Sequence, residues 1–199
     1  MENSRRSTAN TKRLVGMALF TAIIVVLQLL GSFISGFLPV TISLVLIPIV
    51  VGAAVYGPKS GAYFGFVFGV IVLIACITGA DKGGNVLWNV SPIVTAILCL
   101  VKGAAAGLVS GYVYKALSSK NLYLAVIVAA IVCPVVNTGI FCGAMALFFH
   151  ETLVAWAAGS SLLSYTIVGL VGINFLIELG LNVILCPVIC RIINFGKKM

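Results

Sequence analysis

The chain has 199 residues, of which 62% are hydrophobic and only 8% are charged. A soluble domain carries about 25% charged residues. This number of charged residues is too small to cover a water-facing surface. The composition therefore excludes a soluble globular protein and predicts an integral membrane protein. Apolar runs of about 20 residues indicate spanning helices, because the strands of a β-barrel alternate polar and apolar residues over about 10 positions. The predicted fold class is therefore an all-α integral membrane protein.

Polar breaks divide the chain into six predicted transmembrane helices that form a single domain over residues 12–195. A basic segment, 1–11, precedes this domain and a short tail, 196–199, follows it. The first apolar run exceeds the roughly 7–15 residues of a signal-peptide core, so we expect it to remain as a helix. The helices are predicted at about 12–35, 42–56, 60–78, 92–117, 122–149 and 161–191, with loops at 79–91 and 150–160.

The basic residues predict the orientation of these helices, because cytoplasmic loops are enriched in Lys and Arg. With a cytoplasmic N-terminus, Lys82 is the one basic residue of the outer loops, and Lys102 lies inside the fourth helix. The remaining ten of the 12 basic residues lie on the cytoplasmic side: Arg5, Arg6, Lys12, Arg13, Lys59, Lys115, Lys120, Arg191, Lys197 and Lys198. Topology thus explains the net charge of +8, and nothing indicates a nucleic-acid partner. We expect a multi-pass protein of the plasma membrane with both termini cytoplasmic.

Two predicted helices carry glycines four residues apart, a spacing that lets helix backbones approach closely in a membrane. We expect these ridges to form a seam within the chain rather than a subunit interface. They consist of Gly61, Gly65 and Gly69 on the third helix and Gly103, Gly107 and Gly111 on the fourth.

The sequence contains few residues that could form a catalytic or metal site. The six cysteines all lie in apolar runs without a CxxC pair, so we interpret them as packing residues rather than disulfide or zinc ligands. The chain has four acidic residues and one histidine, and it lacks the HExxH, GxSxG and Walker A motifs. We therefore predict no catalytic residue, metal or cofactor. A transport activity would take its energy from partner subunits or from an ion gradient.

Three polar residues of the last predicted helix, Asn174, Glu178 and Asn182, lie four residues apart and share one helix face. An acid in a membrane helix must face a packed interior, a partner or a water-filled cavity. Lys102 is the second ionisable group at membrane depth, about 15 Å from the outer end of its helix. Asn137 follows Pro134 in the fifth helix.

Two interpretations of these residues stay open, and both can hold. Lys102 and Glu178 can form a buried ion pair that joins the fourth and sixth helices. Alternatively, Lys102 meets an anionic group of a ligand, while Asn137 and Asn174 hydrogen-bond to the same ligand. Asn182 lies deeper, and we expect it to bond to a neighbouring helix.

The loop at 79–91 is a second candidate for ligand contact. Its glycines permit movement, and Asn85, Trp88 and Asn89 supply polar groups and an aromatic face on the outer side. Such a loop can act as a lid over a membrane pocket. The alternative is an interfacial Trp anchor with asparagines that cap helices.

The whole chain resembles the substrate-binding S component of an energy-coupling factor (ECF) vitamin transporter. The resemblance rests on the length, the six spans with basic ends inside, the Ala18-x-x-x-Ala22 pattern, and the segment Ile47–Ala62 followed by a glycine-bearing helix. It implies a binding subunit that docks on a transmembrane coupling protein driven by two ABC ATPases. It also implies that Ala18 and Ala22 meet the coupling protein, and that helices four to six hold the ligand near the outer side.

The resemblance does not name the ligand. Lys102 with neighbouring amides suits a small carboxylate such as pantothenate, while the scarcity of acids argues against a cation such as thiamine. Two other classes stay open: an ion-coupled secondary transporter that uses Glu178, and a membrane scaffold that binds no solute.

Overall fold

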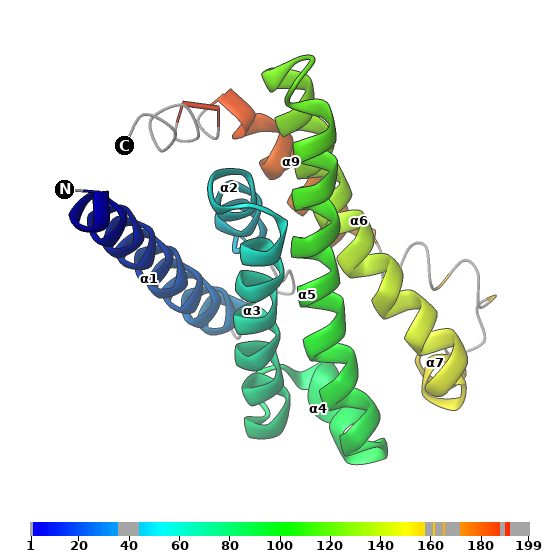
Figure 1. The fold of residues 1–199 in the computed structure, drawn as a ribbon. Coiled ribbons are helices and arrows are strands. Elements are labelled where there is room, and N and C mark those ends of the chain that lie inside the picture. The colour runs from blue at the N-terminus through cyan, green and yellow to red at the C-terminus, as the bar shows by residue number, and fades with distance from the viewer. Residues whose placement is uncertain are drawn as a thin grey trace.

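The computed structural model describes residues 2–35, 44–157, 161, 165, 172–187 and 190–191. Within these ranges the regular structure is helical, without a strand (Figure 1). The helices are α1 (Glu2–Ser35), α2 (Leu46–Tyr56), α3 (Pro58–Thr78), α4 (Lys82–Val90), α5 (Pro92–Leu117), α6 (Leu122–Phe148), α7 (His150–Ala157) and α9 (Gly172–Ile184).

Four segments are long and apolar enough to cross a membrane: Asn10–Gly31, Pro58–Thr78, Pro92–Leu117 and Leu122–Phe148. The helix α2 is also apolar but shorter. An all-helical membrane protein is thus confirmed, while the count of six spans and the cytoplasmic termini stay predictions. Much of the predicted span 161–191 lies outside the described residues, and α9 covers its middle.

The predicted helix bounds agree with the structure within two residues for α3, α5 and α6. The helix α1 differs, because it begins at Glu2 rather than near residue 12. The basic segment before Thr11 contains no glycine or proline that would stop a helix, so it continues the first span toward the N-terminus.

The expected glycine seam joins α3 to α5, which run side by side (Figure 1). A Cβ at Gly61 would clash with the carbonyl of Gly107, and one at Gly65 would clash with the carbonyl of Gly103. The Cβ of a residue at position 69 would lie 3.0 Å from the Cα of Leu100. Such close approach brings backbone atoms into van der Waals contact, which drives helix association in lipid.

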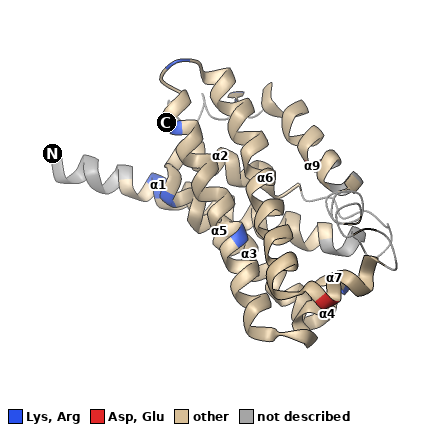
Figure 2. Ribbon diagram, turned by 90° about the vertical axis from the view of Figure 1, so that its right-hand side faces the viewer, with Lys and Arg blue, Asp and Glu red and all other residues tan. Residues whose placement is uncertain are grey.

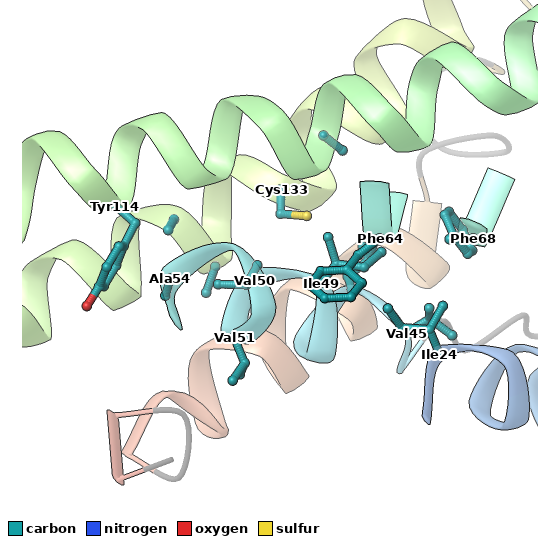
Figure 3. Close-up of a cluster of buried hydrophobic side chains, with 14 of the residues drawn as sticks. Ile24, Val45, Ile49, Val50, Val51, Ala54, Phe64, Phe68, Tyr114 and Cys133 are labelled. Carbon is teal, nitrogen blue, oxygen red and sulfur yellow. The ribbon is translucent and has the colours of Figure 1, made fainter. Parts of the chain in front are cut away.

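The main core forms around α2, which buries most of its length (Figure 3). Side chains from α1, α3, α5 and α6 converge on it, among them Ile24, Phe64, Phe68, Tyr114 and Cys133. Over Asn10–Gly31 most other side chains of α1 are exposed, and Phe20 attaches this helix to the core with its ring 5.9 Å from those of Tyr56 and Phe64.

Two segments predicted as loops are short helices. Over 79–91 the structure has α4, and Asp81 caps it by accepting a hydrogen bond from the backbone N–H of Gly84 at 3.0 Å. The helix α7 covers the described part of the second segment, 150–157. The cap and the burial of Leu87, which is 2% exposed, outweigh the two helix-weakening glycines of α4.

Charged residues separate toward the two ends of the bundle. Basic residues lie where α5 leads into α6, and the opposite end beside α4 and α7 carries an acidic residue together with a basic one (Figure 2). Arg13 belongs to the basic end, because its guanidinium donates to the carbonyl of Tyr56 and the hydroxyl of Ser60, both at 3.4 Å. This separation agrees with the sidedness that the sequence predicts.

Candidate functional site

The ammonium of Lys102 lies against a ring of the neighbouring helix. Its Nζ is 5.2 Å from the centroid of the Phe141 ring, so α5 and α6 meet here through a cation–π contact. Both side chains are half-buried. The sequence analysis predicted a role for Lys102 but not for Phe141, although Phe141 follows Asn137 by four residues and so shares its helix face.

Asn137 lies one helical turn before Phe141 on α6. Its Oδ1 is buried and has no hydrogen-bond partner among the residues that the structure describes. A buried acceptor without a partner costs about 1–3 kcal/mol, so such an atom calls for a donor beyond the described residues. A cation of α5 thus contacts α6 at Phe141, and an acceptor without a partner among the described residues lies four residues before Phe141 on the same helix face.

The polar residues of α9 form a separate group. Glu178 is 9% exposed, and Asn182 is fully buried with its Nδ2 donating to the carbonyl of Glu178 at 2.9 Å. Glu178 lies near enough to interact electrostatically with Cys133 of α6. The Nδ2 of Asn182 thus bonds within its own helix, and its Oδ1 has no partner in the described part of the chain, so the expected bond to a neighbouring helix stays a prediction.

The two ionisable residues are adjacent to different levels of α6. Lys102 faces Phe141, whereas Glu178 neighbours Cys133, eight residues earlier. Eight residues of α-helix span about 12 Å. The side chain of Asn174 lies outside the described residues, so its predicted role stays a prediction.

The residues predicted for a lid lie on the capped helix α4. Asn85 donates to the carbonyl of Cys76 at 2.8 Å, which ties α4 to the end of α3. The Nδ2 of Asn89 bonds to the carbonyl of Asn85 at 2.9 Å, and Asn89 is otherwise exposed. Trp88 is half-buried and packs against the main core. These contacts agree with the alternative in which the asparagines support helix ends.

A second apolar group, here called the outer cluster, packs around the site from the side of α4 and α7. Its buried members are Leu87, Leu98, Met145, Phe149 and Leu153, and Phe141 and Trp156 are among the side chains that pack against them. The cluster fixes the ring of Phe141 from the side of α4, α5, α6 and α7. Its residues are ordinary apolar ones, so no sequence signal separates them from lipid-facing positions.

Ala18 and Ala22 are exposed on α1. On a helix they lie opposite Phe20 and Ile24, the residues by which α1 is attached to the core. The face predicted to meet a coupling protein is therefore unoccupied by the described parts of this chain.

All six cysteines are free thiols, and five of them are buried. Cys76 of α3 and Cys99 of α5 face each other with their sulfur atoms 4.0 Å apart. No group of three or more metal-ligating side chains occurs among the described residues.

The family model for the substrate-specific component of ECF transporters matches residues 12–190. The chain belongs to this family. It is also 26% identical over 183 residues to the pantothenic acid transporter PanT of Lactococcus lactis subsp. cremoris (strain MG1363), an alignment that covers 87% of this chain and 89% of that relative. As a member of this family, the chain is a transport subunit. It is a multi-pass protein of the plasma membrane.

Proposed function

We propose that this ECF component binds pantothenate and delivers it to an ECF importer. The observation that carries the proposal is the contact of the Lys102 ammonium with Phe141 of α6, on the helix face that also carries the buried Oδ1 of Asn137, which has no partner among the described residues. Pantothenate carries a carboxylate for the ammonium, and its amide N–H and two hydroxyls are donors for the amide oxygen. The similarity to a pantothenic acid transporter supports the same ligand.

The other predicted residues take supporting roles in this proposal. Asn174 contributes a further hydrogen bond from the sixth span, and Glu178 borders the inner side of the pocket. Trp88 and Asn89 of α4 cover the outer side, while Asn85 holds α4 on the end of α3. Six spans with both termini in the cytoplasm place the ligand site toward the outer surface, in line with the basic residues near the α5–α6 turn.

Energy for transport comes, in this proposal, from partner subunits rather than from this chain. A transmembrane coupling protein and two ABC ATPases supply it, and the exposed face with Ala18 and Ala22 docks on the coupling protein. Ligand binding then needs the chain alone, whereas transport needs the whole assembly.

Two measurements test the proposal. Purified protein in detergent is screened by thermal shift and calorimetry against pantothenate, thiamine and other vitamins. A ligand at a hundredfold excess over its Kd stabilises the folded state by about 2.7 kcal/mol, which is a readily measured rise in Tm. We expect a shift with pantothenate and none with thiamine. A folded protein that shifts with another vitamin, or with none, would overturn the assignment of the ligand.

The second measurement is uptake of labelled pantothenate into proteoliposomes. We expect uptake with the coupling protein, the ATPases and ATP, and none with this chain alone under a proton or sodium gradient. Gradient-driven uptake by the isolated chain would instead favour an ion-coupled transporter that uses Glu178.

A further inference from the structure

We propose that Phe141 is a positioning residue that makes the site prefer anionic over neutral ligands. Its ring holds the Lys102 ammonium at the place where a ligand carboxylate meets it. This inference rests on the proposed function, because it concerns the same site, and it assigns a role to a residue that the motifs of the sequence do not mark.

In the predicted topology Lys102 lies about 15 Å along α5 from the outer end of the helix, and an ammonium at membrane depth needs a partner. The face of an aromatic ring attracts a cation within about 6 Å of its centroid, and the contact with Phe141 is 5.2 Å. The ring therefore stabilises Lys102 inside the bundle before any ligand is present.

The ring itself is held firmly. Phe141 packs against the outer cluster, which includes Met145 one turn later on α6 and Leu98 one turn before Lys102 on α5. Since both partners belong to helices that pack along their length, the ring cannot follow the ammonium if the latter moves. The position of the ammonium is thus set by a fixed apolar surface.

A ring and a carboxylate can bind one ammonium together. Lys presents three N–H donors, and the ring of Phe141 occupies only one side of the group. Without the ring, the flexible stem of Lys102 would let the ammonium snorkel toward the outer water. Binding of a carboxylate would then include the free-energy cost of moving the ammonium back into the site. A neutral ligand does not need the ammonium there, so its affinity would not change.

The test compares pantothenate with pantothenol, in which a primary alcohol replaces the carboxylate. Phe141→Leu removes the ring and keeps an apolar side chain. We expect it to weaken pantothenate binding by about tenfold, within the range of a cation–π contact, and to change pantothenol binding by less than about twofold. Phe141→Tyr keeps a ring face and should restore the preference for pantothenate. Calorimetry on the purified full chain gives both Kd values.

Phe148→Leu is the matched control, because Phe148 lies on the same helix and is 65% exposed. It should leave both affinities unchanged. Equal loss of the two affinities in Phe141→Leu would overturn the inference, since it would mean that the ring serves packing only. If Phe141→Leu gives no folded protein, Phe141→Met makes the same comparison.

A wild-type chain that binds no pantothenate would overturn the proposed function, whereas wild-type binding with an unchanged preference in the variant would overturn this inference alone.

Discussion

Gly65 of α3 and Gly103 of α5 touch through their backbones. The carbonyl of Gly103 occupies the space in which a side chain at position 65 would begin, and the carbonyl of Gly65 does the same at position 103. The relation is reciprocal, so neither helix can carry a larger residue here without moving away from the other. Because Lys102 precedes Gly103 directly, the same contact fixes the height and rotation of the candidate site on α5.

Gly65→Ala should therefore destabilise the protein. The added methyl group must push α5 outward, and overpacking of this kind costs about 1–3 kcal/mol. Thermal unfolding in detergent measures the effect as a fall in Tm. Gly143→Ala is the control, because a Cβ at Gly143 of α6 would meet nothing within 4 Å. Its Tm should stay constant or rise slightly, since alanine favours a helix by about 0.5–1 kcal/mol. Equal behaviour of the two variants would contradict the seam.

The seam shows which parts of this fold can be read from the sequence. In lipid, glycines four residues apart have one main structural use, so the pairing of α3 with α5 was predictable. The helices α4 and α7 were not, because α4 begins with Lys82-Gly-Gly and α7 begins with the polar run His150-Glu-Thr. Their helical state depends on the Asp81 cap and on packing of Leu87 and Leu153 against other helices, which are tertiary effects.

Lys102→Met should separate the two interpretations of this lysine. It keeps an apolar stem and removes the charge, so a carboxylate ligand loses a charge-assisted hydrogen bond worth about 1.5–3 kcal/mol. We expect pantothenate affinity to fall about 10- to 150-fold. The ligand-free Tm should not fall, because an ammonium at membrane depth is costly to bury.

The control for Lys102→Met is Lys115→Met, which changes an exposed lysine in the last turn of the same helix. It should alter neither affinity nor Tm. If Lys102→Met instead lowers the ligand-free Tm strongly, with proportionate losses for charged and neutral ligands, the lysine serves a structural ion pair. Both quantities come from one set of thermal-shift titrations.

The candidate site was predictable only in part. Charge in an apolar helix is rare, so Lys102 and Glu178 stand out in any reading of the sequence. The same rarity left open whether they pair or line a pocket, and that question stays open, while the contact of Lys102 with Phe141 and the closeness of Glu178 to Cys133 are visible only in the structure. The neighbours of Lys102 and Glu178 depend on how far α5, α6 and α9 are shifted along one another. The spacing of residues within each helix carries no information on that shift.

Asn85→Ala should weaken the corner between α3 and α4. The variant loses the 2.8 Å hydrogen bond to the carbonyl of Cys76 and leaves that acceptor without its donor. The expected loss of stability is about 1 kcal/mol, seen as a lower Tm of the ligand-free protein. Asn89→Ala is the control, because Asn89 is exposed and bonds only within α4. A large loss of pantothenate affinity in Asn85→Ala at constant Tm would show that Asn85 contacts the ligand instead.

Bulky residues on the exposed face of α1 should separate transport from binding. Ala18→Trp with Ala22→Trp fills a surface that lies opposite Phe20 and Ile24, so the main core is untouched. We expect pantothenate to bind with unchanged affinity, while ATP-dependent uptake by the reconstituted assembly falls to background. The physical reason is that a small-residue surface permits close backbone approach, and two indole rings prevent it.

Leu30→Trp provides the matched control for this last prediction. Leu30 is 52% exposed and lies on the flank of α1, away from the Ala18 and Ala22 face. The same bulk at this position should leave both binding and uptake near wild type. Pull-down of the coupling protein by tagged wild-type and variant chains measures docking directly. If the double variant loses ligand affinity as strongly as uptake, the face supports the fold rather than the docking. If it keeps full uptake, the coupling protein meets another surface of the chain.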